Sequence, residues 1–97
     1  MIADHADQVF MDSKMIIKVK EPQAIERKML QRDQILFTYL HLAPDPDQTE
    51  DLVNSGAVCV AYETVTDANG SLPLLMPMSQ VAGRLSVQAG ARCLEKE

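Results

Sequence analysis

Three side chains with acid–base or charge-binding chemistry follow three apolar segments of this 97-residue chain. Lys20 ends the first segment, His41 follows the second, and Glu63 follows the third; the segments are residues 15–20, 34–40 and 57–62. A lysine ammonium suits the carboxylate of a small acid. A histidine titrates near neutral pH and can pass a proton to and from a carbonyl oxygen. A lysine and a histidine together suit the interconversion of an amino acid and its keto acid. The hydride that this reaction transfers would need a cofactor.

Each of these residues also has an ordinary structural interpretation. Lysine and glutamate at strand ends are usually solvated, and a histidine there is often a hydrogen-bonded turn residue. The functional interpretation depends on their convergence, because parallel sheets bind ligands outside the carboxyl ends of their strands. Lys18 alternates with Lys20, so the two should point to one face of a strand. We therefore expect Lys20 and His41 to lie at one edge of the sheet.

The elements that would position these residues alternate between strand and helix. The three apolar segments are predicted strands, and helical patterns cover residues 4–11, 23–30 and 45–55. After a turn-rich stretch at 66–73 with Asn69-Gly70, Pro77 opens a long helix to about Lys96. This order predicts an α/β fold with a three-stranded parallel sheet. We expect the long helix to pack on that sheet.

Proline also stands at the starts of the second and third predicted helices. Pro22 stands where the second helix could begin, because proline has no N–H to leave unpaired there. Asp45 can cap the third helix, Pro46 fits its first turn, and Gln48 can complete a capping box. Gly56 should end that helix in the left-handed conformation that glycine tolerates.

Composition argues against several classes of partner. The net charge is −5 and the nine basic residues are scattered, which disfavours nucleic acid and anionic membranes. No apolar run approaches the length of a membrane span, and Asp4 and Asp7 do not suit a signal peptide, so we expect a cytoplasmic chain. Cys59 lies in an apolar run where a buried thiol is expected, and its distance from Cys93, His5 and His41 predicts no metal site.

Four segments resemble the alanine dehydrogenase family, in the order and at the spacing of that family. They are Ile17–Pro22 (IKVKEP), Phe37–Ala43 (FTYLHLA), Ala61–Val65 (AYETV) and residues 72–91. The resemblance implies part of a flavodoxin-like or Rossmann-like substrate domain, and NAD-dependent oxidative deamination of L-alanine to pyruvate. The related proton-pumping transhydrogenase domain lacks the histidine of the second motif, so His41 favours the dehydrogenase.

The resemblance also implies roles for individual residues. Lys20 would bind the substrate carboxylate, and His41 would be the catalytic proton donor and acceptor. Met78 would bind substrate, and Ser79 would contact the nicotinamide of the cofactor. Glu63 lies in a matching motif without an implied role. Met76 and Gln80 differ from the alanine and glutamate that are usual in the family, and both border the implied pocket.

The resemblance covers only part of what such an enzyme needs. We expect residues 1–97 to be one truncated substrate domain, because the family's upstream segment with a substrate-binding arginine is not in the sequence. Gly56, Gly70, Gly83 and Gly90 cannot form the G-x-G-x-x-G turn of a dinucleotide domain, so we expect no bound NAD and no turnover by this chain alone. Alanine or pyruvate should bind weakly, and the chain should form a homodimer. The alternative is a non-catalytic binding or self-associating module derived from that domain.

Overall fold

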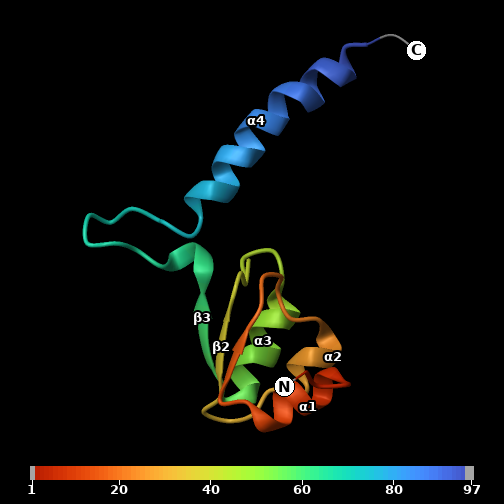
Figure 1. Cartoon of the computed structure of the whole chain (residues 1–97), viewed down its shortest axis with the longest axis vertical. Coiled ribbons are helices and arrows are strands. Elements are labelled where there is room, and N and C mark those ends of the chain that lie inside the picture. Colours follow the sequence, from red (N-terminus) through yellow and green to blue (C-terminus); the bar gives the residue numbers. More distant parts are fainter. Residues whose placement is uncertain (1, 96–97) are drawn as a thin grey trace. The chain divides into compact units, whose positions relative to one another are not determined.

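The computed structural model describes residues 2–95 as four α-helices, three strands and one short 3-10 helix (Figure 1). Two units divide the chain, one ending at Glu63 and the other beginning at Thr64. The first unit contains α1 (Ala6–Asp12), β1 (Met15–Ile17), α2 (Ala24–Arg27), β2 (Ile35–Thr38), α3 (Pro46–Ser55) and β3 (Val58–Ala61). The 3-10 helix covers Tyr62–Thr64, and α4 covers Met76–Cys93 in the second unit.

The three strands form one parallel sheet in the order β1-β2-β3, which confirms the predicted fold class. Ile16, Leu36 and Cys59 share one row across the sheet. Each strand is shorter than predicted. β1 ends at Ile17 because the chain bends at Val19 and Lys20, so the alternation expected to align Lys18 with Lys20 does not continue.

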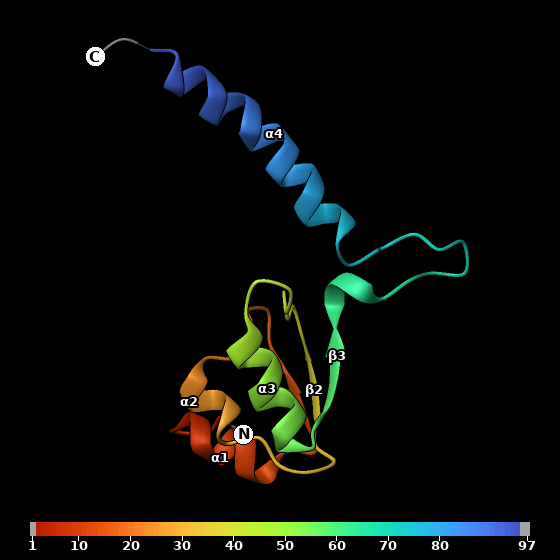
Figure 2. The same cartoon turned by 180° about the vertical axis from the view of Figure 1, so that it is seen from behind.

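One face of the sheet carries the hydrophobic core of the first unit. Figures 1 and 2 show α1, α2 and α3 on the same side of the sheet. Six buried residues form the core cluster, contributed by α1, β1, β2, α3 and the segments after α2 and β2: Phe10, Ile16, Leu30, Leu36, Leu40 and Leu52. The three helices bury the apolar side chains of this face. Their packing fixes the sheet that carries Lys20 and His41 at its carboxyl edge.

The opposite face of the sheet, which we call the open sheet face, is also apolar. It consists of two rows of aligned residues: Met15, Ile35 and Val58, then Ile17, Phe37 and Val60. Ile17 is 64% exposed and Val58 is 52% exposed. Apolar side chains on both faces are typical of parallel sheets, which are normally covered on both sides. The open sheet face is therefore a surface suited to burial against another element.

The helix ends follow local capping chemistry, with two corrections to the predictions. α2 starts two residues after Pro22 and ends at Arg27 rather than at 30, and its capping box is formed by Gln23 and Glu26. At α3, the Asp45 side chain accepts a hydrogen bond from the Gln48 N–H at 2.9 Å. Gly56 ends α3 at φ +70°, as predicted.

The side chain of Gln48 does not complete the capping box predicted for α3. Its amide nitrogen donates to the carbonyl oxygen of Leu40 at 2.6 Å instead. Gln48 is 1% exposed, so a tertiary partner inside the first unit replaces the local one. This contact attaches α3 to the chain just after β2.

The second unit contains a turn and the long helix. The carboxylate of Asp67 accepts hydrogen bonds from the N–H groups of Asn69 and Ser71, both at 2.9 Å, and Gly70 has φ +80°. α4 has proline in its first turn, as predicted, but it begins at Met76 and ends at Cys93 rather than near Lys96, which lies outside the described residues. The expected packing of α4 on the sheet stays a prediction.

None of the helices within residues 2–95 combines the length and the apolar character that crossing a membrane requires.

Candidate functional site

The structure brings Lys20 and His41 to the same edge of the sheet. β1 and β2 are parallel, and each of the two residues follows the carboxyl end of its strand by three residues. Hydrogen bonds from the Lys18 N–H to the Phe37 oxygen and from the Tyr39 N–H to the Val19 oxygen continue the pairing past β1. The two residues therefore lie in adjacent chain segments, where ligands of parallel sheets bind.

Lys20 has a fixed backbone and an exposed side chain. The hydroxyl of Thr38, which is fully buried, donates to the carbonyl oxygens of Lys20 at 2.8 Å and of Val19 at 3.1 Å. The ammonium group lies 3.7 Å from the Glu21 carboxylate, and the Lys20 side chain is 83% exposed. Such an exposed pair is weak, so the ammonium remains available to an incoming anion.

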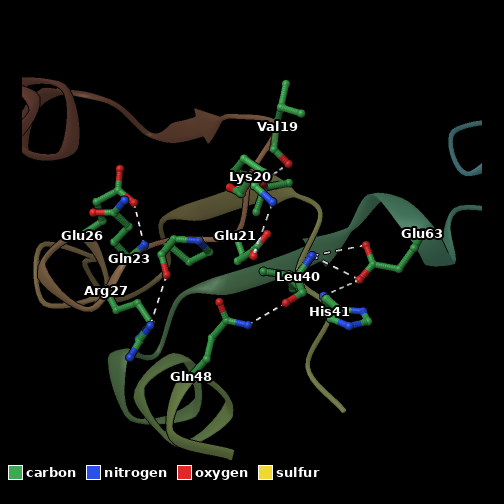
Figure 3. Close-up of polar contacts among 12 residues, drawn as sticks. Val19, Lys20, Glu21, Gln23, Glu26, Arg27, Leu40, His41, Gln48 and Glu63 are labelled. Carbon is green, nitrogen blue, oxygen red and sulfur yellow. Dashed lines mark hydrogen bonds and ion pairs between the residues drawn. The ribbon is translucent and has the colours of Figure 1, made fainter. Parts of the chain in front are cut away.

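His41 occupies an uncommon backbone conformation. Its φ is +46°, in the left-handed region that few residues other than glycine adopt, although asparagine, aspartate and histidine do so more often than the rest. The Glu63 carboxylate accepts hydrogen bonds from the N–H of His41 at 2.7 Å and from the N–H of Leu40 at 3.1 Å (Figure 3). We call these contacts the Glu63 clamp. They join the end of β3 to the turn after β2.

The charge on Glu63 is stabilised by the groups that it clamps. Partial burial alone would raise the pKa of Glu63, but the N–H donors of His41 and Leu40, together with the His41 imidazole, bring the pKa below its ordinary value. A carboxylate that accepts hydrogen bonds from backbone N–H groups is favoured in its ionised form. The clamp is therefore charged near neutral pH.

The turn between Leu40 and His41 is also held from α3. Leu40 donates its N–H to Glu63, and its carbonyl oxygen accepts from Gln48 at 2.6 Å. Its side chain is 2% exposed within the core. Both backbone polar groups of Leu40 and its side chain are thus engaged, which leaves the turn little freedom to move (Figure 3).

Lys18 has a structural partner of its own. Its ammonium contacts the Glu26 carboxylate at 2.5 Å, and both side chains are 22% exposed. Burial would raise the pKa of Glu26, but Lys18 and the Gln23 N–H outweigh it and lower that pKa. Lys18 therefore ties β1 to the start of α2.

Met78 and Ser79 lie in the first turns of α4, in the second unit. Both residues are exposed, and the Ser79 hydroxyl donates to the carbonyl oxygen of Leu75 at 3.3 Å. A shallow hollow beside Ser79 is lined by Gly70, Ser71, Leu72, Leu75 and Met76. The implied contacts of Met78 with substrate and of Ser79 with nicotinamide stay predictions.

The residues do not fit a complete dinucleotide site. A dinucleotide phosphate turn needs closely spaced glycines between a strand and a helix N-terminus. In this chain Gly56 caps the end of α3, Gly70 lies in the turn before α4, and Gly83 and Gly90 lie inside α4. None of the four glycines therefore lies in a dinucleotide phosphate turn.

Between residues 2 and 95, the cysteines form no disulfide and the acidic residues form no cluster with metal-ligand geometry. Cys59 and Cys93 are free, and partial burial raises the pKa of the Cys59 thiol, which disfavours its thiolate. Within residues 2–95, no cluster of three His, Cys, Asp or Glu side chains could hold a metal ion.

Three supporting residues of this edge are not identifiable from the sequence alone. Thr38 has the pattern of an ordinary strand residue, Gln48 has the spacing of a local cap, and Glu63 lies in a motif without an implied role. Each acts through a backbone group between 8 and 23 positions away in the chain. The signal available for Glu63 is its position at a third strand end, which places it at the correct edge.

The fold places the chain among α/β proteins built on a parallel sheet. The family model described as "Alanine dehydrogenase/PNT, N-terminal domain" matches residues 1–82, and the chain belongs to this family. This result confirms the resemblance seen in the sequence motifs.

Curated relatives cover most of this chain. An alanine dehydrogenase of Halomonas elongata is 60% identical over 85 residues, which is 88% of this chain and 23% of that protein. An alanine dehydrogenase of Methanococcus maripaludis is 54% identical over 92 residues, which is 95% of this chain and 25% of that protein. A solved L-alanine dehydrogenase has 52% identity and a TM-score of 0.83, covering 98% of this chain and 26% of that one. The chain thus spans about a quarter of the length of these relatives.

Proposed function

We propose that this chain supplies the carboxylate-binding and acid–base groups of an NAD-dependent alanine dehydrogenase. In this proposal Lys20 binds the carboxylate of alanine or pyruvate, and His41 gives a proton to, or takes it from, the group on C2. The observation that carries the proposal is the left-handed His41, held by the Glu63 clamp at the edge that also carries Lys20. Strained backbone that the surroundings impose is concentrated at functional sites.

The chemistry assigned to each residue follows from its surroundings. The Lys20 ammonium is a compact cation whose ion-pair partner, the Glu21 carboxylate, lies 3.7 Å away, so a substrate carboxylate can replace that contact. The His41 side chain is exposed, and its backbone is fixed. A proton donor needs that fixed position, because proton transfer requires hydrogen-bond distance to the reacting atom.

Met78 and Ser79 complete the proposal. Met78 would contact the substrate, and Ser79 would contact the nicotinamide of NAD, as the resemblance implies. NAD supplies the hydride chemistry when it is bound. The residues described above provide the carboxylate and proton contacts only, so we expect a polypeptide of these 97 residues to show no alanine oxidation with NAD.

Binding of pyruvate to the 97-residue chain tests the proposal directly. In a titration followed by amide and imidazole NMR signals, we expect shifts centred on Lys20 and His41, with a dissociation constant in the millimolar range, about −4 kcal/mol. Lys20→Ala should abolish the response, whereas Lys28→Ala, which removes an exposed lysine at the end of α2, should leave it unchanged. Shifts that avoid Lys20 and His41 would refute the proposal.

A second candidate function is a non-catalytic, self-associating module. The open sheet face favours it, because its six aligned side chains are apolar and include no charge that would repel a second copy. The two functions are separated by ligand dependence. A module of this kind would associate without any response of Lys20 or His41 to pyruvate.

The cytoplasmic location stays a prediction.

A further inference from the structure

Three observations define the Glu63 clamp. One carboxylate accepts two consecutive backbone N–H groups, at 2.7 Å from His41 and at 3.1 Å from Leu40. The clamped residue is a histidine at φ +46°. The carboxylate comes from the end of the next parallel strand, 22 residues further along the chain.

The relative direction of the two N–H groups is set by φ and ψ of Leu40, the backbone torsions that lie between them. Adjacent N–H groups of an extended strand point in opposite directions, so one acceptor cannot bind both. Consecutive N–H groups that point to the same side make a concave site for an anion. Glu63 fills that site and holds the peptide unit that precedes the Cα of His41, so the left-handed turn of His41 starts from a fixed plane.

We propose that Glu63 is a positioning residue, which directs the His41 imidazole by fixing the backbone of the turn. This inference rests on the proposed function of His41 as the acid–base group. The direction of a side chain from its Cα is set by φ and ψ, so releasing the backbone to an extended conformation redirects the imidazole. Glu63 acts through the N–H groups of the turn and needs no contact with substrate.

Purely structural attachment of β3 is the competing explanation for the clamp. The two explanations differ in their dependence on residue 41. Asparagine adopts the left-handed region more readily than histidine, because its short polar side chain can hydrogen-bond to the local backbone. With asparagine at position 41, the turn should keep its geometry without help from Glu63. A structural attachment would be equally important in both backgrounds.

The test is a double-mutant cycle in the 97-residue chain with Glu63→Gln and His41→Asn. The first readout is the backbone conformation of residue 41, measured by the intraresidue amide–Hα cross-peak, which is strong at positive φ. We expect Glu63→Gln to weaken this cross-peak when residue 41 is histidine and to leave it unchanged when residue 41 is asparagine. Equal weakening in both backgrounds, or none in either, overturns the proposal.

The second readout is pyruvate binding, with Glu50→Gln as the matched control. Glu50 is an exposed residue of α3, so its neutralisation removes the same charge away from the turn. We expect Glu63→Gln to weaken pyruvate binding about tenfold, equivalent to about 1.4 kcal/mol, and Glu50→Gln to have no effect. A chain that folds but binds no pyruvate would refute the proposed function, while the cross-peak would still decide whether Glu63 positions residue 41.

Discussion

Thr38→Val removes one hydroxyl from the centre of the sheet while preserving the shape of the side chain. Thr38 is fully buried, and its hydroxyl proton is shared between the oxygens of Lys20 at 2.8 Å and Val19 at 3.1 Å. Val19 also accepts from the Tyr39 N–H at 3.3 Å, so it keeps a partner. The Lys20 carbonyl, which has the shorter bond to the hydroxyl, loses that donor.

The expected loss of stability is about 1–2 kcal/mol, because the Lys20 carbonyl loses its donor and a methyl group takes the place of the hydroxyl beside two carbonyl oxygens. Urea unfolding followed by circular dichroism measures this value. The slope against urea should stay constant, since the surface exposed on unfolding is unchanged. Thr66→Val, at an exposed position, is the control and should stay within about 0.5 kcal/mol of the unmodified chain.

The same substitution should also loosen Lys20 and weaken the pyruvate response of its signals, because the hydroxyl anchors the Lys20 backbone. If Thr38→Val unfolds at the same urea concentration as Thr66→Val, the shared hydroxyl does not hold the end of β1. If stability falls but the Lys20 signals are unaffected, the hydroxyl contributes to the sheet alone.

Gly56→Ala should destabilise the chain by about 1–2 kcal/mol in thermal or urea unfolding, because φ is +70° and the new methyl would lie 3.3 Å from Cγ of Arg32. The control, Gly83→Ala, lies in open space within α4 and should instead stabilise that helix by about 1 kcal/mol. A gain in stability on Gly56→Ala would contradict the expected backbone strain. Acid should destabilise the first unit, since the pKa values of Glu26 and Glu63 are lowered on folding: their contribution is full above the ordinary value of 4.5 and is lost as pH falls through the lower folded values. Unfolding at acidic pH should show this loss reduced in Glu63→Gln, and an unchanged pH profile would refute it. We also expect the chain to form a homodimer through the open sheet face, which light scattering at micromolar concentration would detect. Ile17→Lys, which places a charge on that face, should restore the 10.7 kDa monomer. A monomeric unmodified chain would count against the predicted dimer.

The parallel sheet could be predicted because its signal is local and repeated. Three apolar segments alternate with helical patterns, and Gly56 marks the end of α3 by its chemistry alone. The strand ends could not be predicted in the same way. β1 stops where the chain bends at Val19, and no residue type in the segment announces that bend.

The supporting contacts of the site could not be predicted for a related reason. Gln48 is three residues after Asp45, which is the spacing of a capping box, yet the Leu40 carbonyl offers a buried partner that the local pattern does not reveal. The Glu63 clamp joins residues 22 and 23 positions apart, and its donors and acceptor meet only after β3 has paired with β2. The family motifs located His41 and Lys20, whereas tertiary contacts give Thr38 and Glu63 their functions.

The length of chain between the two ends of the Glu63 clamp has a consequence for the order of folding. The segment that it closes contains α3 and β3, so the clamp must form after most of the β2-α3-β3 crossover. The β2–β3 pairs are themselves 23 residues apart, so once they have formed the clamp closes almost no further loop and adds little entropy cost. The turn at His41 is therefore expected to reach its final geometry after the core around Leu36 has assembled. A chain emerging from the ribosome would acquire its sheet before its acid–base geometry.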